Sequence, residues 1–282
     1  MRPLFLLSLF APAFALASAE GVNPKATDLF EIGGIPVSNS ILTTWILAVL
    51  IIIAVRVLVG TPKIIPNKGQ ALVENVASGL RDSLEPIVGK KMIGKTFPVL
   101  CGFFVFILLM NWSGLLPGVG TIKFQSADGH WLDAIRPANS DLNTTLALSI
   151  LSFLAWTYFV LRYAGFKALV FDLFGNKADK KELSIPLWIM LSFIFLGVGG
   201  IEVVSIAFRL ISLSFRLYGN VYGGENLIHA LGGIAPYVIP AVAGLLEVLV
   251  GLIQAFVFTL LSAVYIGLIC NHEGGHDEEH AH

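Results

Sequence analysis

The chain has 282 residues, of which 56% are hydrophobic and only 13% are charged, and its formal net charge is −1. Its mean hydropathy of +0.81 is far above that of a soluble globular protein. The near-neutral charge argues against a nucleic-acid partner, and Cys101 and Cys270, each isolated in or beside an apolar run, argue against a metal site or a disulfide framework.

The amino terminus has the pattern of an export signal. Arg2 precedes a short apolar run, and Ala17 and Ala19 have the spacing of a signal-peptidase site. We therefore expect residues 1–19 to be a removable signal peptide, with a short uncleaved anchor as the alternative. Either way, residues 20–39 should form a periplasmic segment, so the mature amino terminus lies outside the cytoplasm.

Apolar runs predict five membrane-spanning helices and an all-α membrane domain over residues 40–270. The spans cover about residues 40–59, 97–116, 142–163, 186–218 and 236–270. Loops rich in lysine alternate with a loop rich in aspartate, which by the positive-inside rule places the carboxyl terminus in the cytoplasm. Residues 271–282 mix histidines with acids, which favours a solvated tail over a metal site.

The segment between the first two spans is basic and amphipathic. Residues 70–87 carry apolar side chains such as Leu72, Val76 and Leu80, a spacing that predicts a helix along the cytoplasmic surface. Residues 89–96 then match the phosphate-loop pattern GxxxxGKT. That pattern needs a strand before it, and here a surface helix precedes it and a membrane span follows. We interpret its lysines as anchors to lipid headgroups.

The last two spans are longer than the roughly 20 residues that cross a bilayer upright. They must be tilted or broken, and Gly197, Gly199 and Gly200 could break the fourth span. We expect the two spans to form a long, tilted hairpin connected by residues 219–235.

A polar stripe follows one face of the fourth span. Its members are three or four residues apart: Glu202, Ser205, Arg209, Ser212, Arg216 and Asn220. An arginine at the bilayer centre costs roughly 3 kcal/mol on insertion scales, so Arg216 indicates ion handling inside the membrane. We expect Arg209 to be a structural partner of Glu202. A hairpin would also turn Glu247 and Gln254 of the fifth span toward this stripe.

Several motifs carry a resemblance to a known family. They are IEVVS at 201–205, SLSFRLYGN at 212–220, YGGE at 222–225, LIQAFVF at 252–258, LMNWSGLLP at 109–117 and PANSDLNT at 137–144. In order and spacing they resemble the a subunit of F-type ATP synthases. The resemblance covers about residues 35–270.

The resemblance implies a role for each matched residue. Arg216 would face the ion-binding carboxylate of a rotating c-ring. The outer half-channel would be lined by Asn220, Glu225, Glu247 and Gln254, and the cytoplasmic opening by Glu202 and Ser205. Many relatives have histidine at the position of Glu247. This chain has glutamate at both positions 225 and 247.

These roles describe a non-catalytic, cofactor-free subunit whose two half-channels couple proton flow to rotation and ATP synthesis. Its partners would be the c-ring, the peripheral-stalk b subunits, the rest of the ATP synthase and the lipid of a bacterial inner membrane. The alternative is a self-contained ion-coupled secondary transporter. Midplane charges and broken helices would fit such a transporter, but the sequence shows no internal repeat.

Overall fold

A computed structural model describes residues 26–116, 119, 123–125, 131–133, 135–175, 185–232 and 238–270. Over this part of the chain the protein is almost entirely helical, and five helices are long and apolar enough to cross a membrane. The predicted all-α membrane fold is confirmed. The predicted signal peptide and the carboxyl-terminal tail lie outside the described residues.

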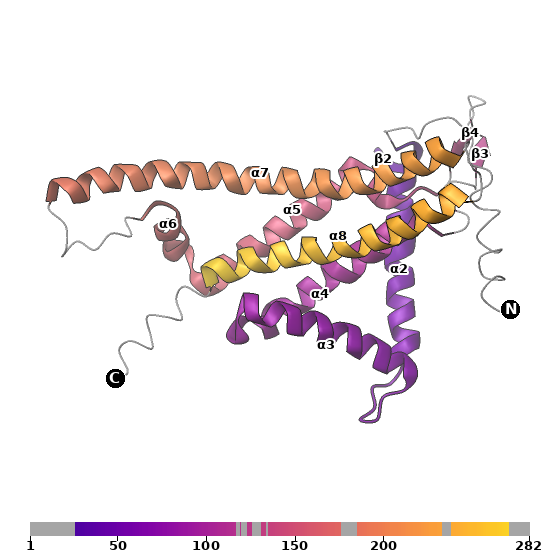
Figure 1. The fold of residues 1–282 in the computed structure, drawn as a ribbon, viewed down its shortest axis with the longest axis horizontal. Helices are drawn as coiled ribbons and strands as arrows, with labels where there is room; N and C mark the ends of the chain where they lie inside the picture. The colour runs from indigo at the N-terminus through magenta and orange to yellow at the C-terminus, as the bar shows by residue number, and fades with distance from the viewer. Residues whose placement is uncertain are drawn as a thin grey trace.

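The elements follow one another in chain order (Figure 1). They are β1 (Asp28–Ile32), β2 (Ile35–Ser38), α2 (Asn39–Val59), α3 (Lys68–Val88), α4 (Lys90–Ser113), β3 (Lys123–Gln125), β4 (Trp131–Asp133), the 3-10 helix η1 (Ala138–Ser140), α5 (Leu142–Phe159), the π-helical turn η2 (Val160–Ala164), α6 (Phe166–Phe174), α7 (Ile185–Gly232) and α8 (Val238–Cys270). The four strands form two antiparallel hairpins. Neither the hairpins nor α6 was predicted from the sequence.

The second span begins earlier than predicted. α4 starts at Lys90, so residues 90–96 of the phosphate-loop-like pattern are helical, and α3 rather than a strand precedes them. Thr96 is buried, and its Oγ1 donates a hydrogen bond to the carbonyl oxygen of Met92 at 3.1 Å. This segment therefore lacks both the strand and the accessible hydroxyl of a phosphate loop.

The fourth span is one unbroken helix of 48 residues. The alternative of a break at the glycines is therefore excluded, and the predicted end near Tyr218 is wrong. Gly199 instead permits close packing, because a Cβ there would lie 2.3 Å from the carbonyl oxygen of Leu173 in α6. A helix of this length measures about 72 Å. Of the two alternatives for a span this long, a tilt or a break, α7 therefore has the tilt. α7 and α8 indeed run at a steep angle to α2 (Figure 1).

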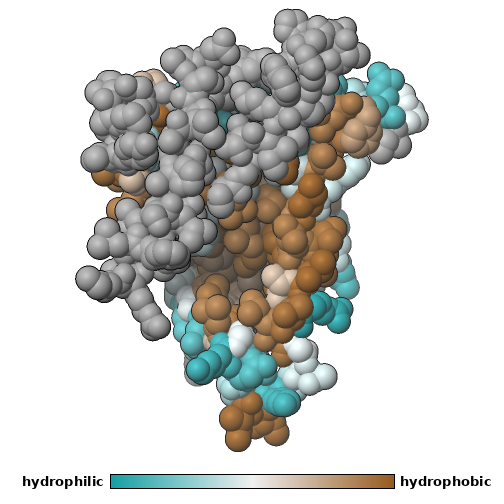
Figure 2. Space-filling view, turned by 90° about the vertical axis from the view of Figure 1, so that its right-hand side faces the viewer, coloured by the Kyte–Doolittle hydropathy of each residue, from teal (hydrophilic) through white to brown (hydrophobic). Residues whose placement is uncertain are grey.

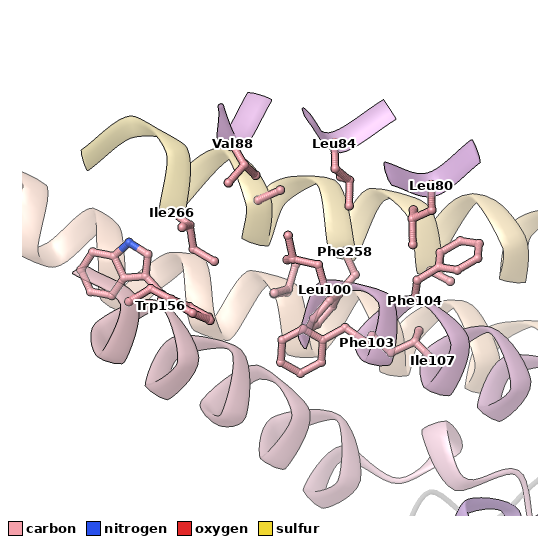
Figure 3. Close-up of a cluster of buried hydrophobic side chains, with 14 of the residues drawn as sticks. Leu80, Leu84, Val88, Leu100, Phe103, Phe104, Ile107, Trp156, Phe258 and Ile266 are labelled. Carbon is pink, nitrogen blue, oxygen red and sulfur yellow. The ribbon is translucent and has the colours of Figure 1, made fainter. Parts of the chain in front are cut away.

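The main core lies where α3, α4, α5 and α8 meet. Leu84, Leu100 and Phe258 are fully buried there, and the rings of Phe103 and Phe258 pack edge to face with centroids 5.7 Å apart (Figure 3). The amphipathic α3 buries Leu84 on its apolar side, as its sequence pattern predicts. This packing fixes α8, which carries half of the candidate site.

A buried polar network joins the ends of α2 and α5. The Ser40 hydroxyl donates to the Asp141 carboxylate at 2.6 Å, and Asp141 also accepts a hydrogen bond from the backbone N–H of Asn143 at 3.1 Å. Asp141 is therefore the N-cap of α5. Beside it, Arg136 Nε donates to the Ser140 hydroxyl at 2.7 Å.

Gly267 allows α8 to contact the end of α3. An added Cβ would lie 2.4 Å from the carbonyl oxygen of Ile87 and 3.4 Å from the Cα of Val88. Because backbone atoms cannot rotate away, we expect Gly267→Val to destabilise the protein by about 1–3 kcal/mol, seen as a lower thermal unfolding temperature in detergent. Gly79→Val is the matched control, since a Cβ at Gly79 meets nothing within 4 Å. An equal loss in both variants would contradict this packing.

Candidate functional site

The candidate site lies along the seam between α7 and α8. Asn220 Nδ2 of α7 donates a hydrogen bond to Gln254 Oε1 of α8 at 3.0 Å. Gln254 is 5% exposed, and its Nε2 makes no hydrogen bond within the described residues. A buried amide that retains a free donor can bind a further polar group. The two long helices therefore share a polar contact in an otherwise apolar part of the chain.

Glu247 lies against α7 two turns before Gln254. A Cβ on Gly224 would be 3.1 Å from Glu247 Oε1, so the carboxylate rests on the bare backbone of the residue next to Glu225. Both glutamates are half-buried. The structure thus brings Glu247 to the part of α7 that carries Glu225, on the same seam as Asn220 and Gln254.

Two side chains of α4 hold the α8 backbone between Glu247 and Gln254. Asn111 Nδ2 donates to the carbonyl oxygen of Gly251 at 3.1 Å, and Trp112 Nε1 donates to that of Val248 at 3.0 Å. Asn111 in turn accepts a hydrogen bond of 2.7 Å from Asn139 Nδ2. These residues set the position of α8 along α4. They were not predicted as site residues, although polar side chains at the end of an apolar span were a signal for them.

Arg216 projects from α7 beside the buried face of that helix. Leu213 and Leu217 on either side of it are 6% and 0% exposed, whereas Arg216 itself is exposed. Ile211 and Phe215 flank it with 45% and 55% of their surface exposed. A cation on an open apolar helix face within a membrane needs an anionic or aqueous partner.

The amino-terminal part of the polar stripe contains an ion pair. Arg209 Nη2 lies 3.8 Å from Glu202 Oε1, which confirms the predicted partnership. The Arg209 guanidinium carbon also lies 3.4 Å from the centroid of the Tyr265 ring on α8, close enough for a cation–π contact. Ser205 is exposed beside this pair. Arg216, by contrast, makes no ion pair in the part of the chain that the structure describes.

A small cavity adjoins this ion pair between α5, α7 and α8. Its volume is about 40 Å³, and its lining includes Ser152, Arg209, Ser262 and Tyr265. The hydroxyl oxygens of Ser152 and Ser262 are 2.8 Å apart. Most of the lining is apolar, but the cavity is large enough for a water molecule beside these hydroxyls. No group of three or more histidine, cysteine, aspartate or glutamate residues is placed to bind a metal in the described ranges.

Comparisons with known proteins agree on one family. A family model described as "ATP synthase A chain" matches residues 41–267. The chain is 28% identical over 242 residues to "ATP synthase subunit a 2" of Bradyrhizobium sp. (strain BTAi1), which covers 86% of this chain and 93% of that protein. It is also 28% identical over 243 residues to "ATP synthase subunit a" of Moorella thermoacetica, covering 86% and 95%.

Proposed function

Because the chain belongs to the ATP synthase A chain family, and is thus a proton-translocating subunit of the membrane sector, we propose that the α7–α8 seam forms two half-channels that meet at Arg216. The outer one is lined by Asn220, Glu225, Glu247 and Gln254, and the cytoplasmic one opens at Glu202 and Ser205. The Asn220–Gln254 hydrogen bond of 3.0 Å carries this proposal, since it joins the polar residues of both helices on one side of Arg216.

The outer half-channel delivers a proton to a carboxylate on the partner c-ring. Glu225 and Glu247 can each take up and release a proton, whereas the amides of Asn220 and Gln254 can only orient a carboxyl group or water. A protonated rotor carboxyl group can turn into lipid, while an ionised one would cost several kcal/mol there. Loading the proton therefore permits rotation in one direction.

Arg216 acts when the rotor carboxyl group returns. Its guanidinium favours the ionised carboxylate, so the proton leaves toward Glu202 and Ser205. The fixed cation also repels a proton that would pass directly from one half-channel to the other. A charge that crosses 100 mV releases roughly 2.3 kcal/mol, which drives rotation. In this scheme the chain performs no covalent chemistry, and the partner catalytic subunits make ATP.

The open apolar surface around Arg216 suits contact with the rotor. Phe208, Ile211 and Phe215 are 65%, 45% and 55% exposed on α7, a larger apolar area than a lone surface residue presents. We assign this surface to the c-ring and the remaining contacts to the peripheral-stalk b subunits and the catalytic sector. The complex lies in the bacterial inner membrane, with a cleaved signal peptide preceding the mature chain.

Reconstitution distinguishes this subunit from a self-contained transporter. We expect vesicles that contain the purified chain alone to show no potential-driven proton uptake, because no rotor carboxylate bridges the half-channels. Adding the purified c-ring should restore uptake, measured with a pH-sensitive dye inside the vesicles, and vesicles with the c-ring alone are the control. Proton or solute movement by the chain alone would favour the transporter.

Two cysteine probes test the orientation. Glu31 on β1 and Lys68 at the start of α3 are both exposed, so burial does not limit their labelling. In a background without Cys101 and Cys270, an impermeant maleimide should label Glu31→Cys in intact spheroplasts and Lys68→Cys only after permeabilisation. The reverse pattern would overturn the orientation. Amino-terminal sequencing of the mature protein should find its first residue near Glu20.

A further inference from the structure

Three helices enclose an apolar wedge on the α2 side of the molecule. α2 contacts α4 and η1 toward one end and α3 at the other, where a Cβ on Gly69 would lie 2.5 Å from the carbonyl oxygen of Leu58. α3 and α4 join at Gly89. The helices α2, α3 and α4 therefore form the sides of a triangle (Figure 1).

A groove of about 570 Å³ lies between α2 and α4 in this triangle. It is lined by apolar residues and glycine: Ala48, Ile51 and Ile52 of α2, and Phe97, Pro98, Cys101, Gly102, Val105 and Phe106 of α4. Figure 2 shows this face of the molecule as apolar and hollowed above a band of polar residues. A spanning helix about 30 Å long and about 10 Å wide occupies roughly 2,400 Å³. The groove could therefore hold only a fraction of such a helix.

α3 closes the wedge at its lower end. Leu72, Val76 and Leu80 follow each other at steps of four and lie on one side of α3, but Leu80 is 5% exposed while Leu72 and Val76 are 58% and 44% exposed. The apolar side of α3 is thus covered by protein only in its second half. A helix that crossed the membrane through the wedge would collide with α3, whereas an acyl chain can end above it.

A cation stands at the lower end of the groove. Lys91 precedes Pro98 by seven residues and Gly102 by eleven, so it shares their face of α4 and lies about 10 Å from Pro98 along the axis. Lys91 is exposed. Lys95 is turned elsewhere, because its Nζ lies 4.2 Å from the centre of the Tyr163 ring. A lysine at this depth suits the phosphate of a lipid whose chains fill the groove.

We propose that an anionic glycerophospholipid binds between α2 and α4, with its acyl chains in the groove and its phosphate at Lys91. The lipid supplies packing that the protein itself does not give to α2, since only 11% of the apolar window of α2 is buried. It thereby holds α2 in place beside α4. The site is separate from the α7–α8 seam, so its failure and that of the proposed half-channels are distinguishable.

Photo-crosslinking in the purified ATP synthase complex tests the proposal. The probe would be phosphatidylglycerol with a diazirine in its acyl chain, and peptide mass spectrometry would locate the attached lipid. Label should concentrate on residues 48–52 and 97–106 rather than on Val57, which is 76% exposed on α2. Phosphatidylcholine with the same diazirine should label these residues less.

Two pairs of variants sharpen the test. Lys91→Gln should weaken the labelling about fivefold, whereas Lys167→Gln, the same charge change on α6, which does not line the groove, should leave it unchanged. Gly102→Leu should abolish the labelling by filling the groove, because a Cβ at Gly102 meets nothing within 4 Å. Gly79→Leu, also in open space but on α3, is the matched control.

Three results would overturn the proposal. Uniform labelling along α2 would mean that the helix contacts only bulk lipid and that no lipid binds specifically in the groove. Labelling that survives Gly102→Leu would place the lipid elsewhere. A short bifunctional crosslinker that joins Cys101, which lines the groove, to another subunit in high yield would show that a protein segment occupies it.

Discussion

Arg216→Ala is expected to reduce proton-driven ATP synthesis to background while leaving the complex assembled. The side chain is exposed, and the neighbouring Leu213 and Leu217 keep their burial against the core, so its removal should not disturb packing. What is lost is the fixed cation that favours the ionised rotor carboxylate. ATP synthesis in inverted membrane vesicles measures the effect, and subunit composition after purification checks the assembly.

Lysine should rescue this variant poorly. Its ammonium lacks the planar fork of a guanidinium and can lose its proton when desolvated. Arg56→Ala is the matched control, because Arg56 is an exposed cation in the last turn of α2 and lies away from the seam. Near-normal synthesis in an assembled Arg216→Ala complex would refute the role given to Arg216, whereas loss in both alanine variants would point to a general effect of removing a cation.

The polar stripe could be predicted from the sequence, but the different surroundings of its two arginines could not. Arg209 and Arg216 are seven residues apart and share one helix face. Arg209 is held by Glu202 and by the ring of Tyr265, which lies 56 positions later in the chain. Only the packing of α7 on α8 shows that one arginine is engaged within the described chain and the other is open.

The spans were predictable because a bilayer requires long apolar helices, while the full length of α7 was not. Residues 219–235 contain glycines and Glu225, which is typical of a connecting loop. In the structure the helix continues through Glu225 to Gly232 because this part of α7 packs along α8, with Glu247 against Gly224. Tertiary contact here overrides the weak helix propensity of glycine.

Local sequence patterns also could not predict which residues hold the site in position. Asn111 reaches a carbonyl oxygen 140 residues away and an amide 28 residues away. Such pairs depend on the folded arrangement of α4, η1 and α8, and no spacing rule within one helix reveals them. The motif that contains Asn111 nevertheless marked it as unusual, since a polar side chain inside an apolar span needs a hydrogen-bond partner.

Glu247→Gln is expected to lower proton flux by roughly tenfold to a hundredfold, because the amide cannot take up and release a proton as a positioned carboxyl group does. Glu225→Gln should have a similar effect, since the Glu247 carboxylate rests against Gly224, the residue next to Glu225. Both variants should also change the pH dependence of the flux. Glu247→His should retain part of the function, because histidine can also carry a proton near neutral pH.

The double variant tests whether the two glutamates act on one proton path. Residues that serve the same step are not additive, so Glu225→Gln combined with Glu247→Gln should be little worse than the poorer single variant. Glu31→Gln, an exposed glutamate on β1, controls for the loss of a charge and should leave the flux unchanged. If the two losses instead multiply, or if Glu247→Gln keeps both the flux and its pH profile, the two carboxylates do not share one half-channel. Multiplied losses would leave Glu247 in a proton path of its own, and an unchanged pH profile would remove it from the path altogether.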